Sequence, residues 1–260
     1  MSTGDQLNTT YLDTPSFVHT PVPKLTLSIV SHGQAELVRP LLLELAALPH
    51  RDFEIILTLN IPEDERPYAV DGLSLTVIRN NVRKGFGANH NAAFRASQAP
   101  YFAVVNPDVR LGQTDPTALL EGFTDSRTAV CAPLVTNSLG EVEDSARRFP
   151  TWRSLTQKAL GRHPRVEYVI GDMPLEVDWV AGMFAVFRRE AYLDVDGFDD
   201  RRYFMYYEDV DVCYRLHQRH WAVLLVPSIR VIHDAQRASR RNARHMRWHA
   251  TSVFRFLTGW

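Results

Sequence analysis

The chain has 260 residues, of which 45% are hydrophobic and 23% charged, which is enough for one large α/β domain with its own core. Its 29 basic and 30 acidic residues leave a formal net charge of -1, which excludes a chain-wide electrostatic basis for wrapping nucleic acid. The longest apolar stretch, at residues 179–187, is far shorter than the roughly 20 residues that cross a bilayer.

Residues 1–22 lack the basic start and apolar run of a secretory signal, so we expect a loose N-terminal arm. After it, short apolar runs alternate with helix-like segments. The runs predict strands at 25–30, 53–59, 75–78 and 101–105, with helices at 36–48 and 87–97. Pro40 inside the first helical segment predicts a kink or a later start. The alternation predicts a doubly wound, mainly parallel sheet with helices on both faces, which binds ligands beyond the carboxyl ends of its strands.

The sequence becomes less regular after Asp115. A strand is expected at 130–135, followed by a polar stretch at 136–178 and an apolar segment at 180–187. Cys131 and Cys213 lie in a predicted strand and a predicted helix, and neither has metal-ligand spacing. We therefore expect buried, reduced thiols in a cytoplasmic protein.

Asn106, Pro107 and Asp108 follow the strand at 101–105, so they lie at the predicted ligand-binding edge. A carboxylate there is the kind of oxygen ligand that Mg²⁺ or Mn²⁺ takes together with substrate phosphates. All three residue types are also common in β-turns, so a purely structural turn is the alternative.

A basic, glycine-containing loop at residues 80–97, NNVRKGFGANHNAAFRAS, runs into a predicted helix. Gly85 and Gly87 would permit close backbone approach, while Arg83, Lys84 and the helix N-terminus favour an anionic group. The segment matches neither a P-loop nor the G-x-G-x-x-G pattern. A strand-to-helix turn with solvated charges fits this segment equally well.

Residues 203–215, YFMYYEDVDVCYR, place three acids after aromatic residues at the start of a predicted helix. The helix N-terminus favours ionised carboxylates, and Asp211 and Arg215 have the spacing of an i,i+4 ion pair. Glu208 and Asp209 are then free to face a pocket, where an ionised carboxylate could accept a proton from a substrate hydroxyl. An acidic helix start with capping value alone is the alternative.

His233 follows the apolar run at 222–232. As a neutral imidazole it could complete a metal site with Asp108, or it could be an ordinary polar residue after a strand.

Arginines and aromatic residues gather in the segment 237–260. They are Arg237, Arg240, Arg241, Arg244, Arg247, Trp248, Phe254, Phe256 and Trp260. Such a segment could lie on an anionic membrane surface or against a lipid-linked molecule, or it could form a helix that packs on the domain. Nucleic-acid binding is a third reading, but no nucleic-acid motif accompanies the arginines.

Five segments occur in a fixed order along the chain. They are LTLSIVSHG, RKGFGANHNAAFRAS, VVNPDV, WVAGMFAVFRREAYLDVDGFDDRRYFMYYEDVDVCYR and VIHDAQRAS. From about residue 25 onward the chain thus resembles the inverting glycosyltransferases of family 2, particularly the bacterial rhamnosyltransferase-like members. The resemblance implies a single α/β GT-A domain at 23–260, with a nucleotide-sugar-binding half at about 23–115, an acceptor and catalytic half at about 116–236 and a basic aromatic segment at 237–260.

The resemblance also implies roles for individual residues. Asp108 stands where many GT-A enzymes have an Asp-x-Asp motif, and with His233 it looks like the ligand pair of Mg²⁺ or Mn²⁺. Asp209 looks like the catalytic base, with Glu208 as the alternative. The residues implied to bind the donor are Ser31, His32, Gly33, Asn60, Arg83, Lys84, Gly85, Asn89, Asn106 and Asp108. Those implied near the acceptor are Trp179, Gly182 and Tyr207.

The chain departs from the family pattern after its second strand and at the end of its first. Where relatives usually read Val-Val-Asp-Asn it reads Leu-Thr-Leu-Asn at 57–60, so the aspartate often associated with the nucleotide base is missing. Ser31, His32 and Gly33 replace the commoner Thr-Tyr-Asn. Recognition of uracil or thymine therefore stays open.

The activity implied by the resemblance is transfer by a single in-line displacement with inversion. The donor is read as dTDP-rhamnose and the acceptor as a carbohydrate or lipid-linked oligosaccharide of bacterial cell-surface polysaccharide synthesis; Lys84 or Arg83 could assist departure of the diphosphate. A UDP- or GDP-hexose donor is one alternative. A catalytically inactive carbohydrate- or membrane-binding protein of the same fold is another. A cytoplasmic protein that could be peripheral at the cytoplasmic face of the inner membrane is expected, and the oligomeric state is open.

Overall fold

The computed structural model describes residues 22–161, 167–233 and 243–259. Within these ranges no helix has the length and apolar character that crossing a membrane requires. The predicted N-terminal arm, apart from Val22, lies outside the described residues, and so do Arg237, Arg240, Arg241 and Trp260.

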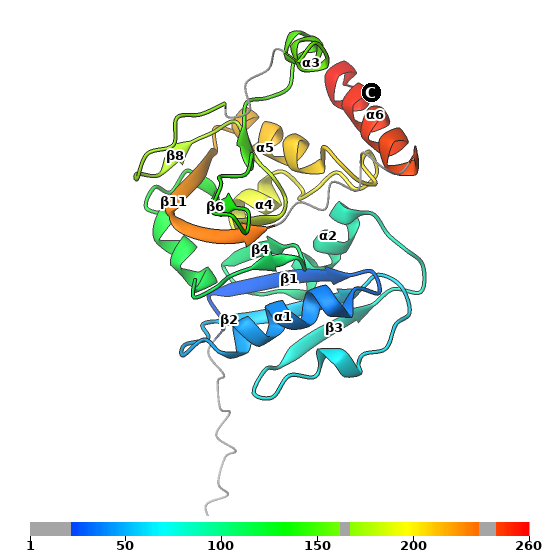
Figure 1. The fold of residues 1–260 in the computed structure, drawn as a ribbon, viewed down its shortest axis with the longest axis vertical. Helices are drawn as coiled ribbons and strands as arrows, with labels where there is room; N and C mark the ends of the chain where they lie inside the picture. Colours follow the sequence, from blue (N-terminus) through cyan, green and yellow to red (C-terminus); the bar gives the residue numbers. More distant parts are fainter. Residues whose placement is uncertain (1–21, 162–166, 234–242, 260) are drawn as a thin grey trace, which may run out of the picture.

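Nine strands of the described residues form one mixed sheet (Figure 1). Its order is β3 (Leu75–Arg79), β2 (Phe53–Leu59), β1 (Leu25–Ser31), β4 (Tyr101–Val105), β10 (Phe184–Arg188), β6 (Thr128–Thr136), β11 (Ala222–His233) and β5 (Val109–Arg110), with β8 (Leu175–Glu176) paired to β11. The first four strands are parallel to one another, and β11 is parallel to β6. Strand β10 runs antiparallel to both of its neighbours, β4 and β6. The α/β class and doubly wound sheet predicted from the alternating pattern are therefore confirmed.

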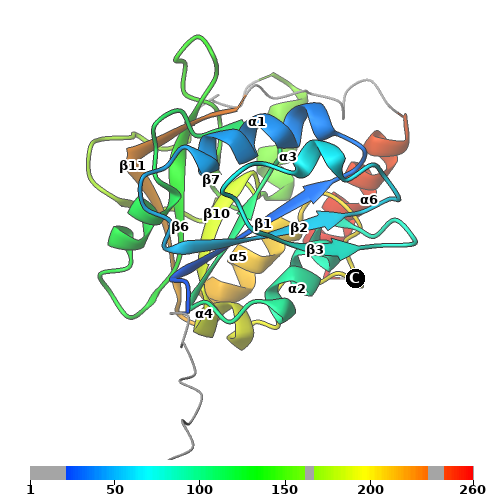
Figure 2. The ribbon, with the colours of Figure 1, turned by 90° about the horizontal axis from the view of Figure 1, so that it is seen from below.

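Helices cover both faces of this sheet (Figure 2). Helix α1 (Ala35–Ala46) lies on one face, and α2 (Phe86–Ala96), α4 (Arg189–Asp194) and α5 (Glu208–Gln218) lie on the other. Side chains alternate along each strand, so Leu27 of β1 packs on the α1 side while Phe102 and Val104 of β4 pack on the α2 and α5 side. Burial on both faces explains why these strands read as continuous apolar runs.

Pro40 lies inside α1 without delaying its start. The helix begins at Ala35, so the expected later start was wrong. A proline at this position removes one backbone donor, but Val38, Leu41 and Leu45 on the same helix are buried against the sheet. Tertiary packing of that apolar face offsets the lost hydrogen bond.

The second half of the chain adds small elements around α5. Strands β7 (Ala146–Arg147) and β9 (Trp179–Val180) form a separate two-stranded sheet. Helices α3 (Trp152–Ala159) and α6 (Ala243–Thr258) lie together at one end of the molecule (Figure 1). Two short 3₁₀ helices, η1 (Arg66–Tyr68) and η2 (Pro116–Gly122), complete the connections.

Helix α6 packs on the domain, which is one of the alternatives that the sequence left open for the C-terminal segment. Ser252 donates a hydrogen bond of 3.0 Å to the carbonyl of Met205, and the rings of Phe204 and Trp248 are 4.9 Å apart. The segment that leads into α5 is therefore held from outside by α6.

Cys131 in β6 and Cys213 in α5 are free and buried, as predicted. Burial raises the pKa of each thiol to about 12, so neither is a reactive thiolate at neutral pH.

Candidate active site

A cavity of about 340 Å³ opens at the carboxyl ends of β1 and β4, and we call it the strand-end cavity. Its wall includes His32 after β1, Asn106 and Asp108 after β4, and Gly182 before β10. The start of α5 and the end of β11 close it with Glu208, Asp209 and His233. The fold thus brings seven of the predicted site residues to one place.

Asp108 and His233 are neighbours in this cavity. Strand β11 pairs with β5 so that His233 faces Val109, the residue after Asp108. The Nε2 atom of His233 is 3.3 Å from Oδ1 of Asp108, and both side chains are largely buried. Among the described residues Oδ1 of Asp108 is a buried atom without a hydrogen bond. A carboxylate oxygen and an imidazole nitrogen in this arrangement fit two ligands of one divalent cation.

Among the described residues, which stop at His233 in this part of the chain, no group of three His, Cys, Asp or Glu side chains could hold a metal. A cation held by Asp108 and His233 could take oxygens of a phosphate group or water as further ligands. Open coordination of this kind is usual for Mg²⁺ bound by one or two carboxylates and a substrate phosphate.

The tripeptide before Val109 is also a turn, as the structural alternative predicted. Its backbone is fixed at both ends, because Asn106 donates to the carbonyl of Met183 at 2.8 Å and Val109 donates to the carbonyl of Asn106 at 3.2 Å. The turn and the ligand interpretations are compatible, since the turn is what directs Asp108 into the strand-end cavity.

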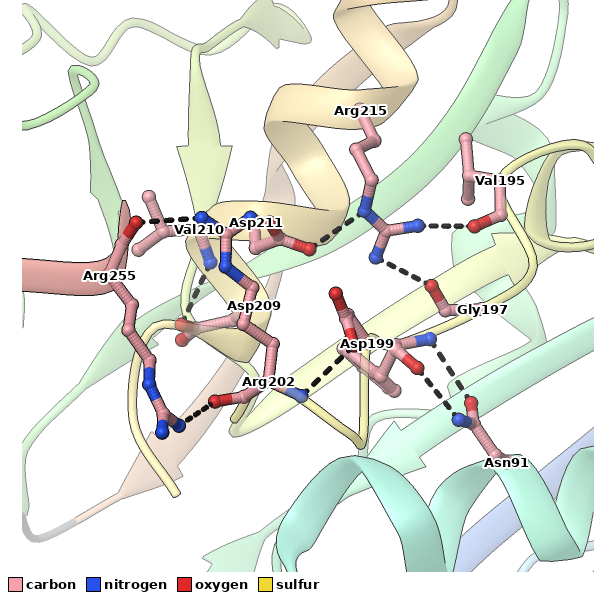
Figure 3. Close-up of polar contacts among 11 residues, drawn as sticks. Asn91, Val195, Gly197, Asp199, Arg202, Asp209, Val210, Asp211, Arg215 and Arg255 are labelled. Atoms are coloured by element: carbon pink, nitrogen blue, oxygen red, sulfur yellow. Dashed lines mark hydrogen bonds and ion pairs between the residues drawn. The ribbon is translucent and has the colours of Figure 1, made fainter. Parts of the chain in front are cut away.

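Asp209 is held by backbone donors on both carboxylate oxygens. Gly182 donates to Oδ2 at 3.0 Å and Val210 donates to Oδ1 at 2.9 Å; Figure 3 shows the second contact at the start of α5. Burial raises the pKa of Asp209, while these donors and the Arg147 charge oppose that increase. The carboxylate is therefore fixed in place and more basic than an exposed aspartate.

Glu208, next to it, has a different environment. Burial raises its pKa well above the ordinary value, and the charge of Asp209 raises it further. Its Oε2 atom is buried and makes no hydrogen bond to the described residues. Two adjacent buried carboxyls favour a single proton between them. The backbone donors at Asp209 favour a protonated Glu208 beside an ionised Asp209.

The third acid of the run, Asp211, is structural, as its spacing predicted. Its Oδ2 atom is 2.7 Å from Nε of Arg215. Arg215 also donates to the carbonyls of Val195 and Gly197, so that it links α5 to the loop after α4 (Figure 3). This network anchors the first turn of the helix that carries Glu208 and Asp209.

A second cavity, of about 610 Å³, lies on the other side of the acid pair, and we call it the aromatic cavity. Phe149, Trp179 and Tyr207 line it, together with the cationic side chains of Arg147 and Arg148. The guanidinium of Arg147 lies 5.7 Å from the centre of the Trp179 ring, against which it is paired in the β7–β9 sheet. Two of the three predicted acceptor residues, Trp179 and Tyr207, therefore belong to this cavity.

The two cavities meet at Tyr206, Glu208 and Asp209, which line both. Tyr206 and Tyr207 both have a left-handed backbone, with φ of 71° and 68°. Such a conformation is costly for large side chains and persists only where the surroundings fix it. Here the hydroxyl of Tyr206 lies 2.8 Å from Nδ1 of His245 on α6.

Other predicted donor residues are used inside the protein. Asn60 is fully buried; its side chain donates to the carbonyl of Lys84 at 2.9 Å and accepts from the Lys84 amide at 2.8 Å. Asn89 is fully buried too and donates to the carbonyl of Gly85 at 3.0 Å. The two amides fix the shape of residues 83–89, which comprise the end of the loop after β3 and the first turn of α2 and which we call the 83–89 loop. Arg83 and Lys84 are exposed and do not line the strand-end cavity.

Both glycines permit close approach of the protein's own segments, while an anionic ligand at this loop stays a prediction. A Cβ on Gly85 would lie 2.4 Å from the carbonyl oxygen of Phe204, and one on Gly87 would lie 2.7 Å from Cβ of Phe198. The loop packs directly against the segment that precedes α5.

The end of β1 is organised by a carboxylate that sequence reasoning missed. Ser31 is fully buried and donates to Glu63 at 2.9 Å, and the amide of Gly33 donates to the same carboxylate at 3.2 Å. Tyr68 also donates to Glu63. Of Ser31, His32 and Gly33, only His32 lines the strand-end cavity. Burial lowers the pKa of His32, so its imidazole is neutral.

His90 and Arg147 were missed as well. His90 lies at the wall of the strand-end cavity, 2.8 Å from the Ser28 hydroxyl, and burial lowers its pKa to about 3. Neither position has a local sequence signal, because each meets its partners through the fold. Tyr206, which lines both cavities, was not predicted either, although the aromatic residues before Glu208 in the sequence were a signal that could have identified it.

The fold and the site together are those of a glycosyltransferase of the GT-A fold. The mainly parallel sheet carries Asp108 and His233, which suit a cation, at its strand ends, and the buried acids Glu208 and Asp209 lie between two cavities. The chain belongs to glycosyl transferase family 2, whose family model matches residues 26–195. That match ends before Glu208, Asp209 and His233, so the geometry above is what associates these residues with the site.

Curated relatives include rhamnosyltransferases. The chain is 34% identical over 178 residues to an N-acetylglucosaminyl-diphospho-decaprenol L-rhamnosyltransferase of Mycobacterium tuberculosis, covering 60% of this chain and 56% of that protein. It is 31% identical over 251 residues to rhamnosyltransferase WbbL of Escherichia coli K12, covering 88% and 90%. The chain thus spans little more than half of the mycobacterial relative and most of WbbL.

Solved structures confirm the GT-A fold. GalNAc-T7 with UDP, GalNAc and Mn²⁺ superposes with a TM-score of 0.60 at 17% identity, over 82% of this chain and 44% of that one. The Pyrobaculum calidifontis mannosyltransferase PcManGT with GDP-Man and Mn²⁺ gives 0.58 at 16% identity, over 91% and 65%. Staphylococcus aureus TarS with UDP gives 0.56 at 13% identity, over 89% and 65%.

Proposed function

We propose that this protein transfers rhamnose from dTDP-rhamnose, with inversion, to a hydroxyl of a carbohydrate or lipid-linked oligosaccharide in cell-surface polysaccharide synthesis. The observation that carries the proposal is the position of Glu208 and Asp209 at the junction of two cavities. The names of the curated relatives support rhamnose. A UDP- or GDP-hexose donor is the second candidate, because two of the similar structures hold UDP and one holds GDP-Man.

The donor is assigned to the strand-end cavity. Asp108 and His233 would hold Mg²⁺ or Mn²⁺ beside the diphosphate, and the bound ion would neutralise charge on the leaving group. His32 and Asn106 line the same wall and can donate or accept hydrogen bonds to the nucleotide sugar. Asn60 and Asn89 would act on donor binding indirectly, because their hydrogen bonds fix the shape of the 83–89 loop.

The acceptor is assigned to the aromatic cavity. Trp179 and Tyr207 offer ring faces to a sugar, as apolar faces of sugars pack on aromatic side chains. Arg148 adds a cation, and Arg147, which already pairs with Asp144, adds a second guanidinium; both suit a phosphate or diphosphate group on a lipid-linked acceptor. The acceptor hydroxyl would then lie beside Asp209 where the two cavities meet, with its oxygen facing the anomeric carbon of the donor in the strand-end cavity.

The chemical step is one displacement. Asp209 takes the proton of the acceptor hydroxyl as that oxygen forms a bond to the anomeric carbon, and the bond from that carbon to the diphosphate oxygen breaks. The diphosphate leaves with the electron pair, and a single attack from the opposite face inverts the configuration. Gly182 and Val210 keep the base aligned by their hydrogen bonds to it.

A nucleotide-binding screen tests this proposal. Thermal unfolding of the purified protein is measured with dTDP-rhamnose, UDP-hexoses and GDP-hexoses, with and without Mn²⁺. We expect one donor to stabilise the protein in the presence of Mn²⁺, and Asp108→Asn to abolish that stabilisation. Asp172→Asn, at an exposed loop position, is the matched control and should behave as wild type. If no donor stabilises either protein and no transfer is detected, the catalytically inactive binding protein is the better description.

A location at the cytoplasmic face of the membrane stays a prediction. The cytoplasm keeps thiols reduced, which agrees with the free Cys131 and Cys213, and we expect the nucleotide-sugar donor to be available there.

A further inference from the structure

Large apolar side chains stand in exposed stripes along α3 and α6. On α3, Trp152 is 58% exposed, and Leu160, which continues the helical hydrogen bonding to Thr156, is 67% exposed. On α6, Met246 is 63% and Phe254 55% exposed. Residues eight apart lie on the same face of a helix, so each helix presents one apolar stripe to solvent.

Two exposed arginines stand directly beside these stripes, at positions 153 and 247. We define the helical rim as Trp152, Arg153, Leu160, Met246, Arg247 and Phe254.

The inner faces of both helices turn toward the rest of the domain. Ser154 and Leu155 of α3 are half-buried and line the aromatic cavity. Trp248 of α6 packs on Phe204, and Ser252 is buried with its hydroxyl on the Met205 carbonyl. The apolar rim side chains keep more than half of their surface exposed, and hydrophobic side chains that remain this exposed together are informative about a partner.

The charge of the rim limits the partner. Neither helix contains an acidic residue: α3 reads WRSLTQKA and α6 reads ARHMRWHATSVFRFLT. Arginine attracts anionic lipid headgroups, and tryptophan prefers the headgroup level of a bilayer. Neither helix could span a membrane, so the contact that fits them is an interfacial one.

We propose that the helical rim docks the protein on a bilayer with anionic headgroups. Its position suits the proposed function, because α3 and α6 both border the aromatic cavity, the latter through His249. Docking there would place the mouth of that cavity at the lipid surface. An acceptor attached to a lipid could then reach Asp209 while its chain stays in the bilayer, and this consequence rests on the proposed lipid-linked acceptor.

Vesicle flotation of the full chain without substrates tests the surface directly. Wild type should float with vesicles of phosphatidylcholine and phosphatidylglycerol, and binding should weaken when phosphatidylglycerol is omitted. The triple variant Trp152→Ser, Met246→Ser, Phe254→Ser removes apolar contact at exposed positions and should lower the bound fraction roughly tenfold. Failure of wild type to bind the anionic vesicles, or undiminished binding by the triple variant, would overturn the proposal.

Three exposed leucines elsewhere provide the matched control. Leu43 is 46%, Leu139 84% and Leu193 59% exposed, and none belongs to α3 or α6. The triple variant that replaces them with serine should float like wild type. Equal loss in both triple variants would point to general surface hydrophobicity and contradict a local docking surface.

The contribution of the arginine charges is tested with the double variant Arg153→Glu, Arg247→Glu. This double variant should lose roughly tenfold in binding to anionic vesicles and little in binding to neutral ones. A second copy of the chain is the competing occupant: concentration-dependent dimers of wild type that the serine triple abolishes, without vesicle binding, would assign the rim to self-association and overturn membrane docking.

Transfer to a short, water-soluble acceptor separates this proposal from the proposed function. Both rim variants should keep wild-type turnover there, because the rim lies outside both cavities. Flotation without any transfer would support the docking surface and contradict the proposed transferase activity. Transfer without flotation would support the transferase activity and contradict the docking surface.

Discussion

Asp209 differs from its two acidic neighbours in the partners that surround it. Asp211 is neutralised by Arg215, and Glu208 has a buried oxygen without a donor among the described residues. Asp209 accepts two backbone hydrogen bonds and faces both cavities. Three acids within four positions thus have three separate environments: spacing identified the ion pair of Asp211 with Arg215, but it could not distinguish Glu208 from Asp209.

Replacing Asp209 with Asn tests its role as base. We expect turnover to fall by roughly 10²- to 10⁴-fold, because the amide cannot take the hydroxyl proton. Nucleotide binding measured by calorimetry should remain, since Asp108 and His233 are unchanged. Glu208→Gln is the comparison: if it loses as much turnover and Asp209→Asn retains activity, the two assignments must be exchanged.

Glu208 is expected to destabilise the folded protein at neutral pH. Its pKa in the folded state lies above that of the unfolded chain, so its contribution to stability is present below the unfolded pKa and is lost as the pH rises through the folded pKa. Glu208→Gln removes this cost.

We expect the Gln variant to gain about 1 kcal/mol at pH 7, or about 2–4 °C in unfolding temperature. The gain should shrink to nothing in acid, where both states of the wild type are protonated. Calorimetric scans from neutral pH to pH 4 check this, and an equal gain at every pH would contradict it.

The sequence predicted that Asp108 and His233 would lie close together, because each comes at the end of a strand and the carboxyl ends of strands meet at one edge. Their binding of a metal stays a prediction. Asn60 and Asn89 were expected to face the nucleotide; in the structure their side chains donate to the backbone carbonyls of Lys84 and Gly85. Glu63 and Arg147 could not be foreseen, since a turn and a strand pairing bring them to their partners.

At the level of elements, the contact between the 83–89 loop and the segment before α5 joins the two halves of the site. Phe86 donates a hydrogen bond of 3.0 Å to the carbonyl of Phe204. Gly85 leaves no space for a side chain beside that carbonyl. The loop after β3 and the aromatic run are therefore a single structural unit.

Gly85→Ala should disrupt the contact between the 83–89 loop and the segment before α5. The added methyl meets a backbone oxygen that cannot rotate away, so we expect a loss of about 1–3 kcal/mol in unfolding free energy, together with reduced turnover. Urea unfolding and a transfer assay measure the two effects. Gly171→Ala is the control, because a Cβ added there would meet nothing within 4 Å, and this substitution should be neutral.

Element boundaries were predicted well where the pattern was strong. Strands β2 and β4 match their predicted ranges, and β1 and β3 each extend one residue further. Strands β1, β2 and β4 are buried on both faces, so their apolar runs end where burial ends, whereas β3 is a partly exposed edge strand. The polar stretch at 136–178 carries no such signal, because β7, β8 and α3 are short and are defined by contacts with distant segments.

On the scale of the whole molecule, the central sheet passes through both predicted halves without a break. Strand β4 of the first half pairs along five positions with β10 of the second. A division near residue 115 therefore does not separate independent cores.

We accordingly expect one cooperative unfolding transition. All five tryptophans lie after residue 150, so tryptophan fluorescence reports the second half, whereas far-ultraviolet circular dichroism reports the entire chain. The two urea curves should coincide within error. Displaced midpoints would show that the halves unfold separately.

The position of β11 bears on the order in which the protein becomes competent during synthesis. This strand is made after both β5 and β6, yet it lies between them in the sheet. Until it inserts, β6 lacks one neighbour and Asp108 has no histidine beside it. The nascent chain can therefore complete much of its nucleotide-side sheet on the ribosome while the cation-suited pair is still unformed, so a premature stop before β11 yields a protein without that site.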